Sequence, residues 1–346
     1  MNDFIDQLKA RIFEGGQITF EEARRLIEIE DRADLDHLLK AAWEITFHFH
    51  SNQPAICSLV NAKSYLCGED CAFCAQSVHF NTEAPRYRLM TSEEILKAAK
   101  VFEAKGIRDF CVVTSGVRLT DDEFEGILKI YRRLRTETRL NLDGSLGFLN
   151  KERVQKLKEA GVRRVNSNLQ SSREFYPKIV SSHTYESRLE ALRMLREGAV
   201  EVCAGGILNV GETREDRIRL AFELKPFSPH CFPVNILHPR PGTPLEYQPR
   251  PEPEEMLKTI AVFRFIHPHA DIKLAGGREY NLTEEEQQKA LQGGANGLIM
   301  GGYLTTQGNP INEDFGLLKR AGYQIPKIQN ADSCKPADDQ RPLPTT

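Results

Sequence analysis

Short apolar runs alternate with amphipathic segments along most of the chain, and this alternation limits the folds that the chain can adopt. Eight apolar runs occur, at residues 56–60, 110–114, 140–146, 164–168, 200–206, 231–236, 272–275 and 297–300. Most are followed by a helix-like segment, at residues 92–105, 122–136, 151–160, 185–198, 213–224, 253–266 and 283–293. Strands that alternate with helices form parallel sheets. Eight such units predict an α/β fold, a (β/α)8 TIM-type barrel, with a doubly wound sheet as the second possibility.

The sequence predicts three regions of different character. Residues 1–50 have helical periodicity, and Thr19 with Glu22 fits a capping box. We therefore expect an N-terminal helical extension over 1–50 and the barrel over 51–326. The tail at 327–346 consists mainly of polar residues and proline, which predicts disorder.

Charge and composition narrow the function classes. The net charge is −3, with acidic and basic residues well mixed, so no clustered basic surface suited to nucleic acid is expected. No apolar run reaches the 18 residues of a membrane span, and the first residues lack the apolar core of a secretion signal. We expect a cytoplasmic protein that binds neither nucleic acid nor membrane. Its eight cysteines are then expected to be reduced and to serve in metal binding, catalysis or core packing.

Three cysteines lie within eight residues, shortly after the first predicted strand. The segment is Cys67-Gly-Glu-Asp-Cys71-Ala-Phe-Cys74. Structural zinc sites usually take four ligands, whereas a 4Fe cluster held by three cysteines leaves one iron open. The spacing resembles the signature of the radical S-adenosylmethionine superfamily. That resemblance implies a 4Fe-4S cluster on Cys67, Cys71 and Cys74, which cleaves S-adenosylmethionine to methionine and a 5′-deoxyadenosyl radical. A zinc site is the alternative.

The residues around this loop, and seven further segments in the same order, are similar to those of the biotin synthase family. The matching segments are 61–77, 166–176, 184–189, 203–213, 233–235, 242–245, 277–279 and 303–306. The resemblance runs from about residue 50 to 326. It implies insertion of sulfur into dethiobiotin by a homodimer that works with a flavodoxin- or ferredoxin-type electron donor and with iron–sulfur assembly proteins.

The same resemblance implies roles for individual side chains, with no catalytic group beyond the clusters. Phe73 would lie near the adenine of S-adenosylmethionine, and Arg188 would contact its carboxylate, which suits a guanidinium fork. Asn168 would touch both the cofactor and dethiobiotin. The residues expected to bind dethiobiotin, at its ureido ring and its carboxylate tail, are Asn168, Asn235, Thr305 and Thr306.

The chain departs from the family at the second cluster. The familiar form has a 2Fe-2S cluster, the apparent sulfur donor, on three strand cysteines and one arginine. The matching positions here are Cys111, Asp143, Cys203 and Arg278, so one expected cysteine is an aspartate.

Two further cysteines, Cys57 and Cys231, could replace the missing cysteine ligand. They fall on other predicted strands, and the interior positions of barrel strands meet in layers. We therefore expect an auxiliary iron–sulfur cluster of the 4Fe type, with Arg278 as a neighbour or ligand. Its expected ligands are Cys57, Cys111, Cys203 and Cys231. The alternative is that Cys57 and Cys231 are core residues, which leaves Cys111, Cys203 and either Arg278 or Asp143. Cys334, in the tail, has no predicted role.

Two other functions stay open at this point. One is a different radical enzyme of the same subgroup, such as a relative of the hydrogenase maturases, which share the barrel and the loop. The other is a zinc-stabilised binding protein without enzymatic activity.

Overall fold

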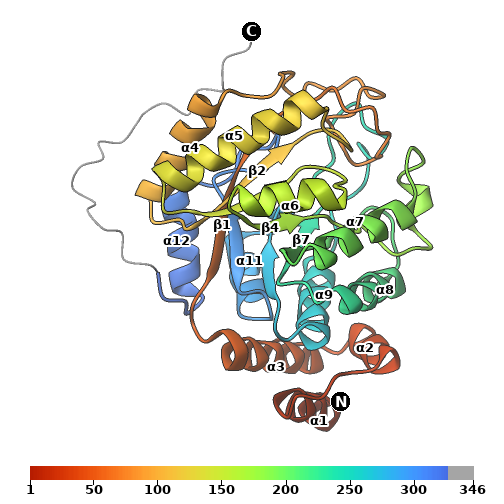
Figure 1. Ribbon diagram of the computed structural model, residues 1–346. Coiled ribbons are helices and arrows are strands. Elements are labelled where there is room, and N and C mark those ends of the chain that lie inside the picture. Colours follow the sequence, from red (N-terminus) through yellow and green to blue (C-terminus); the bar gives the residue numbers. More distant parts are fainter. Residues whose placement is uncertain (326–346) are drawn as a thin grey trace.

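The computed structural model describes residues 1–325, which form a closed barrel of parallel strands surrounded by helices (Figure 1). The strands are β1 (Ala55–Lys63), β2 (Asp109–Thr114), β3 (Asn141–Ser145), β4 (Val162–Asn166), β5 (Glu201–Cys203), β6 (Gly206–Leu208), β7 (Cys231–Ile236), β8 (Asp271–Leu274) and β9 (Gly297–Met300). Their order is β5-β4-β3-β2-β1-β9-β8-β7-β6, and β5 also pairs with β7, which closes the ring. The predicted (β/α)8 barrel is confirmed, and the doubly wound alternative is wrong because that sheet would stay open. The predicted tail and Cys334 lie outside the described residues.

The fifth barrel strand is interrupted, so the eight predicted strands become nine. β5 ends at Cys203 and β6 begins at Gly206. A Cβ on Gly205 would lie 2.1 Å from the Pro233 carbonyl oxygen, so the chain comes too close to β7 there for a side chain. The Gly205 amide donates instead to the Asn168 side chain at 3.0 Å. The sequence pattern did not show this break because a glycine pair in an apolar run also fits a continuous strand.

The helices follow the predicted segments closely. Around the barrel lie α4 (Ser92–Ala104), α5 (Asp121–Glu137), α6 (Lys151–Glu159), α7 (Tyr185–Glu197), α8 (Arg214–Leu224), α9 (Pro253–Ile266), α10 (Arg278–Asn281), α11 (Glu284–Leu291) and α12 (Ile311–Arg320), with short 3-10 turns η1 (Tyr176–Lys178) and η2 (Lys225–Phe227). Several begin at a threonine whose hydroxyl accepts a backbone N–H of the first turn, as Thr91, Thr120 and Thr283 do. No described helix is both long and apolar enough to cross a membrane.

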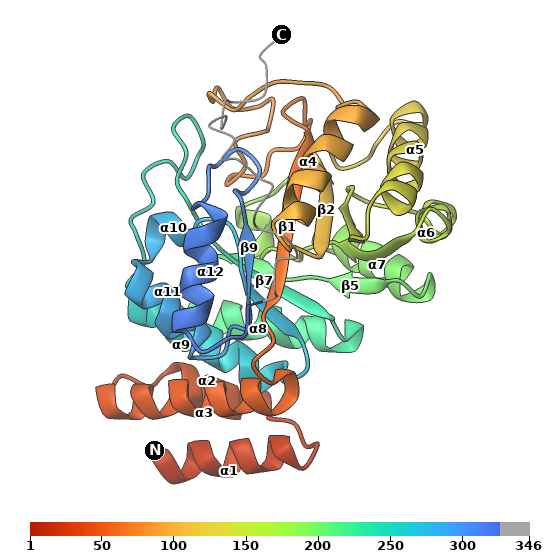
Figure 2. The same ribbon diagram turned by 90° about the vertical axis from the view of Figure 1, so that its left-hand side faces the viewer.

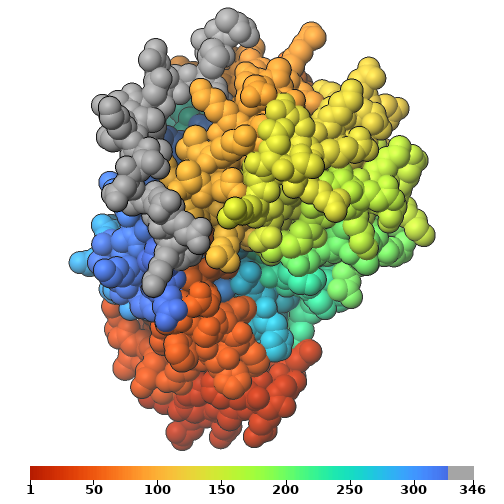
Figure 3. Space-filling view, turned by 60° about the vertical axis from the view of Figure 1, so that its left-hand side comes forward, coloured from red at the N-terminus to blue at the C-terminus, as the bar shows by residue number. Residues whose placement is uncertain are grey.

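Three N-terminal helices pack below the end of the barrel where the strands begin (Figures 1 and 2). They are α1 (Asn2–Phe13), α2 (Phe20–Ile27) and α3 (Arg32–His50). The capping box of Thr19 and Glu22 is present at the start of α2. α3 lies against α1 and α9, and α2 lies against α8 and α9. In the space-filling view these helices form the lower end of the molecule (Figure 3), opposite the cysteine loop.

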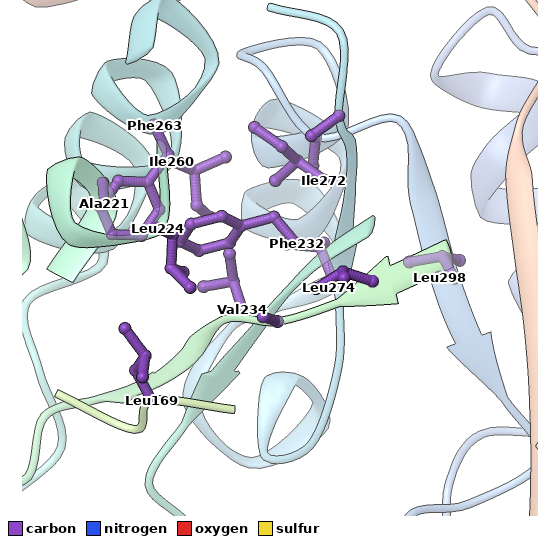
Figure 4. Packing of buried hydrophobic residues seen from close by; sticks show 14 of the residues in the cluster. Leu169, Ala221, Leu224, Phe232, Val234, Ile260, Phe263, Ile272, Leu274 and Leu298 are labelled. Carbon is purple, nitrogen blue, oxygen red and sulfur yellow. The ribbon is translucent and has the colours of Figure 1, made fainter. Parts of the chain in front are cut away.

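β7 shows how the sequence divides the inside of the barrel from its outer layer. Successive strand residues point to opposite faces. Phe232 and Val234 point outward and pack against α8 and α9, with the Phe232 and Phe263 rings 4.9 Å apart (Figure 4). Cys231 and Pro233 point inward and line the central cavity. Apolar packing outside thus positions a thiol inside.

Candidate functional site

The three loop cysteines lie beyond the carboxyl end of β1 and line one side of a cavity of about 260 Å³ inside the barrel. Cys71 is buried, while Cys67 and Cys74 are half-buried. The chain enters the loop with positive φ angles at Tyr65 (60°) and Leu66 (57°), an uncommon conformation for such residues. Backbone bonds then fold the segment back on itself, from Val78 N to Cys67 O (2.9 Å) and from Cys74 N to Cys71 O (2.9 Å).

Two side chains hold this loop in place. The Gln76 side-chain oxygen accepts from Asn61 Nδ2 (3.2 Å), Ser64 Oγ (3.0 Å) and Tyr65 N (3.3 Å), which links the end of the loop to its beginning. Asp70 links the loop to the segment before α7, because its carboxylate accepts from the backbone amides of Ser181 (2.9 Å) and Ser182 (3.0 Å). Burial opposes the Asp70 charge, but these hydrogen bonds outweigh it and hold the pKa of Asp70 well below its usual range.

Four more cysteines line the same cavity, deeper in the barrel. They are Cys57 on β1, Cys111 on β2, Cys203 on β5 and Cys231 on β7. Burial raises the pKa of the Cys57 thiol to about 12 and that of Cys111 well above its usual value. The structure therefore brings together all four cysteines predicted for the auxiliary site.

Cys203 and Cys231 face each other across the closing pair of strands, where they are register partners. A hydrogen bond between the two thiols raises the pKa of Cys203 and lowers that of Cys231. Asn166 Nδ2 also donates to the Cys203 sulfur at 3.3 Å. The pair can therefore lose one proton more easily than two separate buried thiols.

A charged network surrounds the lower part of the cavity. Arg163 lies 3.0 Å from Asp109 and 3.4 Å from Asp143, and Arg164 lies 3.0 Å from Glu201. Burial raises the pKa of Asp143 to about 6 despite the nearby Arg164. Asp143, the position where the family has a cysteine, thus lies beside the thiols as one partner of an ion-pair network.

The cation beside these thiols on β8 is Lys273, and the prediction that placed Arg278 there is wrong. Lys273 is buried and lines the cavity. Burial opposes its charge, but attraction to Cys231 and Cys57 outweighs burial and raises its pKa. Arg278 follows Gly277, whose φ of 80° turns the chain out of the strand direction. Its guanidinium binds Gln287 (2.5 Å) and Asp314 (2.6 Å) between the outer helices.

Arg188 lies on α7, on the side of the cavity next to the loop cysteines. Its Nε donates to the Tyr176 hydroxyl (2.6 Å), its Nη1 to the Asn168 carbonyl (3.0 Å), and its Nη2 lies 3.0 Å from His183 Nε2. His183 Nδ1 lies 2.7 Å from Glu69 in the cysteine loop. The guanidinium is therefore fixed by three neighbours. The sequence did not single out His183 and Glu69, because residues distant in the chain become partners only in the fold.

The residues predicted for substrate border a second cavity of about 160 Å³ that shares part of its wall with the first. Its wall includes Asn168, Asn235, Thr305, Thr306 and Phe73.

The side chains of both asparagines in this wall also form hydrogen bonds with backbone groups. Asn168 Oδ1 accepts from Gly205 N (3.0 Å), and Asn235 bridges Gly206 O (3.0 Å) and Gly276 N (3.1 Å). Each therefore stabilises strand ends in addition to lining the cavity.

The donor sets suit iron–sulfur clusters. Three thiols at the loop and four in the barrel are the ligands that such clusters take. Among the described residues, no three His, Cys, Asp or Glu side chains are close enough to hold a single metal ion. A cluster differs in that it spreads its thiolates over several iron atoms. The buried Arg164 Nη1, without a hydrogen-bond partner among the described residues, also fits an anionic group in the cavity.

Two family models match consecutive parts of the chain. Residues 63–224 match the radical SAM superfamily, and residues 233–324 match the biotin and thiamin synthesis associated domain. The biotin synthase of Clostridium tetani is 43% identical over 325 residues, covering 94% of this chain and 99% of that protein. The biotin synthase of Pelotomaculum thermopropionicum is 44% identical over 314 residues, covering 90% of this chain and 97% of that protein.

Solved structures share the fold at low sequence identity. Methylornithine synthase superposes with a TM-score of 0.81 at 21% identity, covering 93% of this chain and 98% of that one. The FeFe-hydrogenase maturase from Carboxydothermus hydrogenoformans superposes with a TM-score of 0.79 at 16% identity, covering 94% of this chain and 80% of that one. At identities this low, these likenesses show the fold alone.

Proposed function

The chain belongs to the biotin synthase family of radical S-adenosylmethionine enzymes, and we propose which of its residues hold the clusters, the cofactor and the substrate as dethiobiotin is converted to biotin. The reaction replaces two C–H bonds of the substrate by two C–S bonds to one sulfur atom. One observation carries the proposal: a single cavity is lined by the three loop cysteines and the four strand cysteines. Both groups thus face the space in which the substrate would react.

Cys67, Cys71 and Cys74, which line one side of the cavity, would hold the 4Fe-4S cluster. When bound, this cluster supplies the electron that cleaves S-adenosylmethionine. Arg188 binds the carboxylate of that cofactor, because its guanidinium lines the cavity and is already fixed by Tyr176, Asn168 and His183. Preorganised donors of this kind lose little freedom when the ligand arrives.

Phe73 and Asn168 border both cavities, so each can touch the cofactor in one and the substrate in the other. Dethiobiotin occupies the second cavity. Asn235 meets the ureido ring with the amide N–H that its bonds to Gly206 and Gly276 leave available. Thr305 and Thr306 meet the carboxylate tail.

Cys57, Cys111, Cys203 and Cys231 hold an auxiliary cluster of the 4Fe type, which supplies the sulfur when bound. The convergence of all four thiols on one cavity supports ligation over the alternative in which Cys57 and Cys231 are only core residues. Where the familiar form has a third strand cysteine, this chain has Asp143, so that position offers no thiol. The Asp143 carboxylate pairs instead with Arg163 and Arg164. The buried position of the site limits access of water, which protects reactive intermediates.

Our proposal for the cellular setting follows the resemblance to the family. The enzyme is a cytoplasmic homodimer that receives electrons from a flavodoxin- or ferredoxin-type donor. Iron–sulfur assembly proteins rebuild the auxiliary cluster after its sulfur has been used.

The two alternative functions fit the comparisons less well. The likeness to hydrogenase maturases is one of fold, at 16% to 18% identity. The sequence relatives at 43% and 44% identity are biotin synthases matched over nearly their full length. The same relatives argue against a zinc-binding protein without activity.

An anaerobic single-turnover assay tests the proposal. Reconstituted protein is mixed with S-adenosylmethionine, a reductant and dethiobiotin, and biotin and 5′-deoxyadenosine are measured by mass spectrometry. We expect biotin from the parent and from Cys334→Ser, and none from Cys67→Ala or Cys231→Ala. Cys231→Ala should still release 5′-deoxyadenosine, because its loop cysteines are intact. Cofactor cleavage without biotin in a fully loaded parent would disprove the substrate assignment.

A further inference from the structure

Arg164 presents an unsatisfied donor to the auxiliary site. The residue is 5% exposed and extends from β4 into the cavity wall. Its Nε donates to Glu201 at 3.0 Å, which fixes the guanidinium plane. Its Nη1 lies 3.7 Å from Asp109 and 3.8 Å from Asp143, beyond hydrogen-bond distance, and has no partner among the described residues. A buried guanidinium nitrogen without an acceptor is costly unless a ligand supplies one.

Cysteines that line the same cavity lie on strands close to Arg164. On β4, Asn166 follows Arg164 on the same strand face and is the register partner of Cys203, which in turn pairs with Cys231. On the other side, Asp143 is the register partner of both Arg164 and Cys111. Burial opposes the charge of Arg164, but attraction to Asp143, Cys231 and Cys203 raises its pKa, so it stays cationic beside them.

Arg163 precedes Arg164 on β4 and carries the same charge, but its surroundings differ. It pairs with Asp109 and Asp143 in the same network, yet it does not line the cavity. Arg163 Nε also has no hydrogen-bond partner among the described residues. What distinguishes the two arginines is their position, because Arg164 lines the cavity that holds the thiols and Arg163 does not.

We propose that Arg164 is a positioning residue that donates a hydrogen bond from Nη1 to a sulfur atom of the auxiliary cluster and thereby raises the reduction potential of that cluster. The inference rests on the proposed auxiliary site. Hydrogen bonds to sulfur and nearby positive charge favour the more negative, reduced cluster, and both are known determinants of cluster potential. Asp143 occupies the position at which the familiar form has a cysteine ligand, and in this chain its carboxylate helps to hold Arg164 beside the cluster.

The test is a potentiometric titration followed by electron paramagnetic resonance. It uses the full chain with Cys67→Ala, Cys71→Ala and Cys74→Ala, so that only the auxiliary cluster contributes. Arg164→Gln is compared with Arg163→Gln, and iron and sulfide are measured in each. At the midpoint potential of the background protein, we expect Arg164→Gln to lower the ratio of reduced to oxidised cluster roughly tenfold, equivalent to about 59 mV for one electron. Arg163→Gln should change it much less.

Each result bears on a separate claim. Equal shifts in both variants would show a general effect of charge and would overturn the hydrogen bond, as would an unchanged potential in a fully loaded Arg164→Gln. If Arg164→Gln does not fold, Arg164→Lys keeps the charge and should show a smaller shift in the same direction. A background protein that binds no iron, although Arg164 and the four thiols are intact, would disprove the auxiliary site itself.

Discussion

The imidazole of His183 accepts a hydrogen bond from Arg188, with 3.0 Å between His183 Nε2 and Arg188 Nη2. A guanidinium nitrogen only donates, so Nε2 carries no proton and the neutral ring carries its proton on Nδ1. Nδ1 then donates to Glu69 at 2.7 Å. The cysteine loop is in this way connected, through one neutral histidine, to the arginine proposed to bind the carboxylate of S-adenosylmethionine.

The first prediction concerns this connection. His183→Ala removes the acceptor that orients Arg188, and we expect the Kd for S-adenosylmethionine to rise roughly tenfold, about 1.4 kcal/mol. Turnover at saturating cofactor should change less, because the cluster ligands are intact. His183→Gln offers both an acceptor and a donor and should retain most of the affinity. Calorimetry under anaerobic conditions measures both variants, and equal affinity in parent and His183→Ala would contradict the role.

The same contact predicts a pH dependence. Burial, followed by repulsion from Arg188, lowers the pKa of His183 below its ordinary value, which is about 6.5. The neutral ring is therefore the form present at neutral pH. Affinity for S-adenosylmethionine should be constant above about pH 6.5 and should fall below it, as the protonated ring repels Arg188. His183→Gln should lack this decline, and an identical decline in that variant would assign it to another group.

The second prediction is an iron count. Two 4Fe clusters give about eight iron atoms per chain, whereas a 4Fe and a 2Fe cluster give about six. We expect about eight in the parent and in Cys334→Ser, and about four in either Cys67→Ala or Cys231→Ala. Iron and acid-labile sulfide measured on anaerobically reconstituted protein decide this. About eight iron atoms in Cys231→Ala would show that Cys231 is a core residue and not a cluster ligand.

The inward position of Cys231 was predictable because β7 alternates strictly. Phe232, Val234 and Ile236 supply apolar packing on one face, so Cys231, Pro233 and Asn235 had to share the other. Eight repeats of strand and helix were enough to predict closure into a barrel. The predicted convergence of the four strand cysteines follows from these two regularities.

The charged network could not be predicted in this way. An arginine pair on β4 fits a surface strand end as well as a cavity wall, and only the pairing with β3 and β5 places Asp143 and Glu201 beside it. The prediction that Arg278 lies at the auxiliary site was wrong for a local reason. Ala275, Gly276 and Gly277 continue the apolar strand in sequence, but the chain turns at Gly277 into α10. The Arg278 side chain, four residues past the end of β8, thus lies outside the barrel interior.

The third prediction tests the close approach at Gly205. Gly205→Ala places a Cβ 2.1 Å from the Pro233 oxygen, so β5 and β7 must separate where Cys203 and Cys231 pair. We expect a loss of about 1–3 kcal/mol in the free energy of unfolding and reduced iron at the auxiliary site. Gly68→Ala, in the cysteine loop, is the matched control because no atom beyond its chain neighbours lies within 4 Å of the place that the added methyl group would take. Urea denaturation of the cluster-free chains compares the two, and equal stability would contradict the crowding argument.

The last prediction compares the roles of two buried cations, Lys273 on β8 and Arg278 on α10. Arg278→Met leaves the completely buried Asp314 without its partner at 2.6 Å. Removing one member of a buried pair typically costs about 3–5 kcal/mol, and replacing both with apolar residues restores much of the loss. We therefore expect Arg278→Met to lower the free energy of unfolding, and Arg278→Met with Asp314→Leu to recover most of it. In both variants the spectrum of the auxiliary cluster should resemble that of the parent.

Lys273→Met should show the opposite pattern, because Lys273 lines the cavity and attracts Cys231 and Cys57. Loss of this cation destabilises thiolates on both sides of the site, so the auxiliary cluster should form with less iron or with an altered resonance spectrum. Urea denaturation of the cluster-free chain and resonance spectra of the loaded chain distinguish the two variants. An altered cluster in Arg278→Met together with an unaltered one in Lys273→Met would instead place Arg278 at the auxiliary site, as its position in the sequence first indicated.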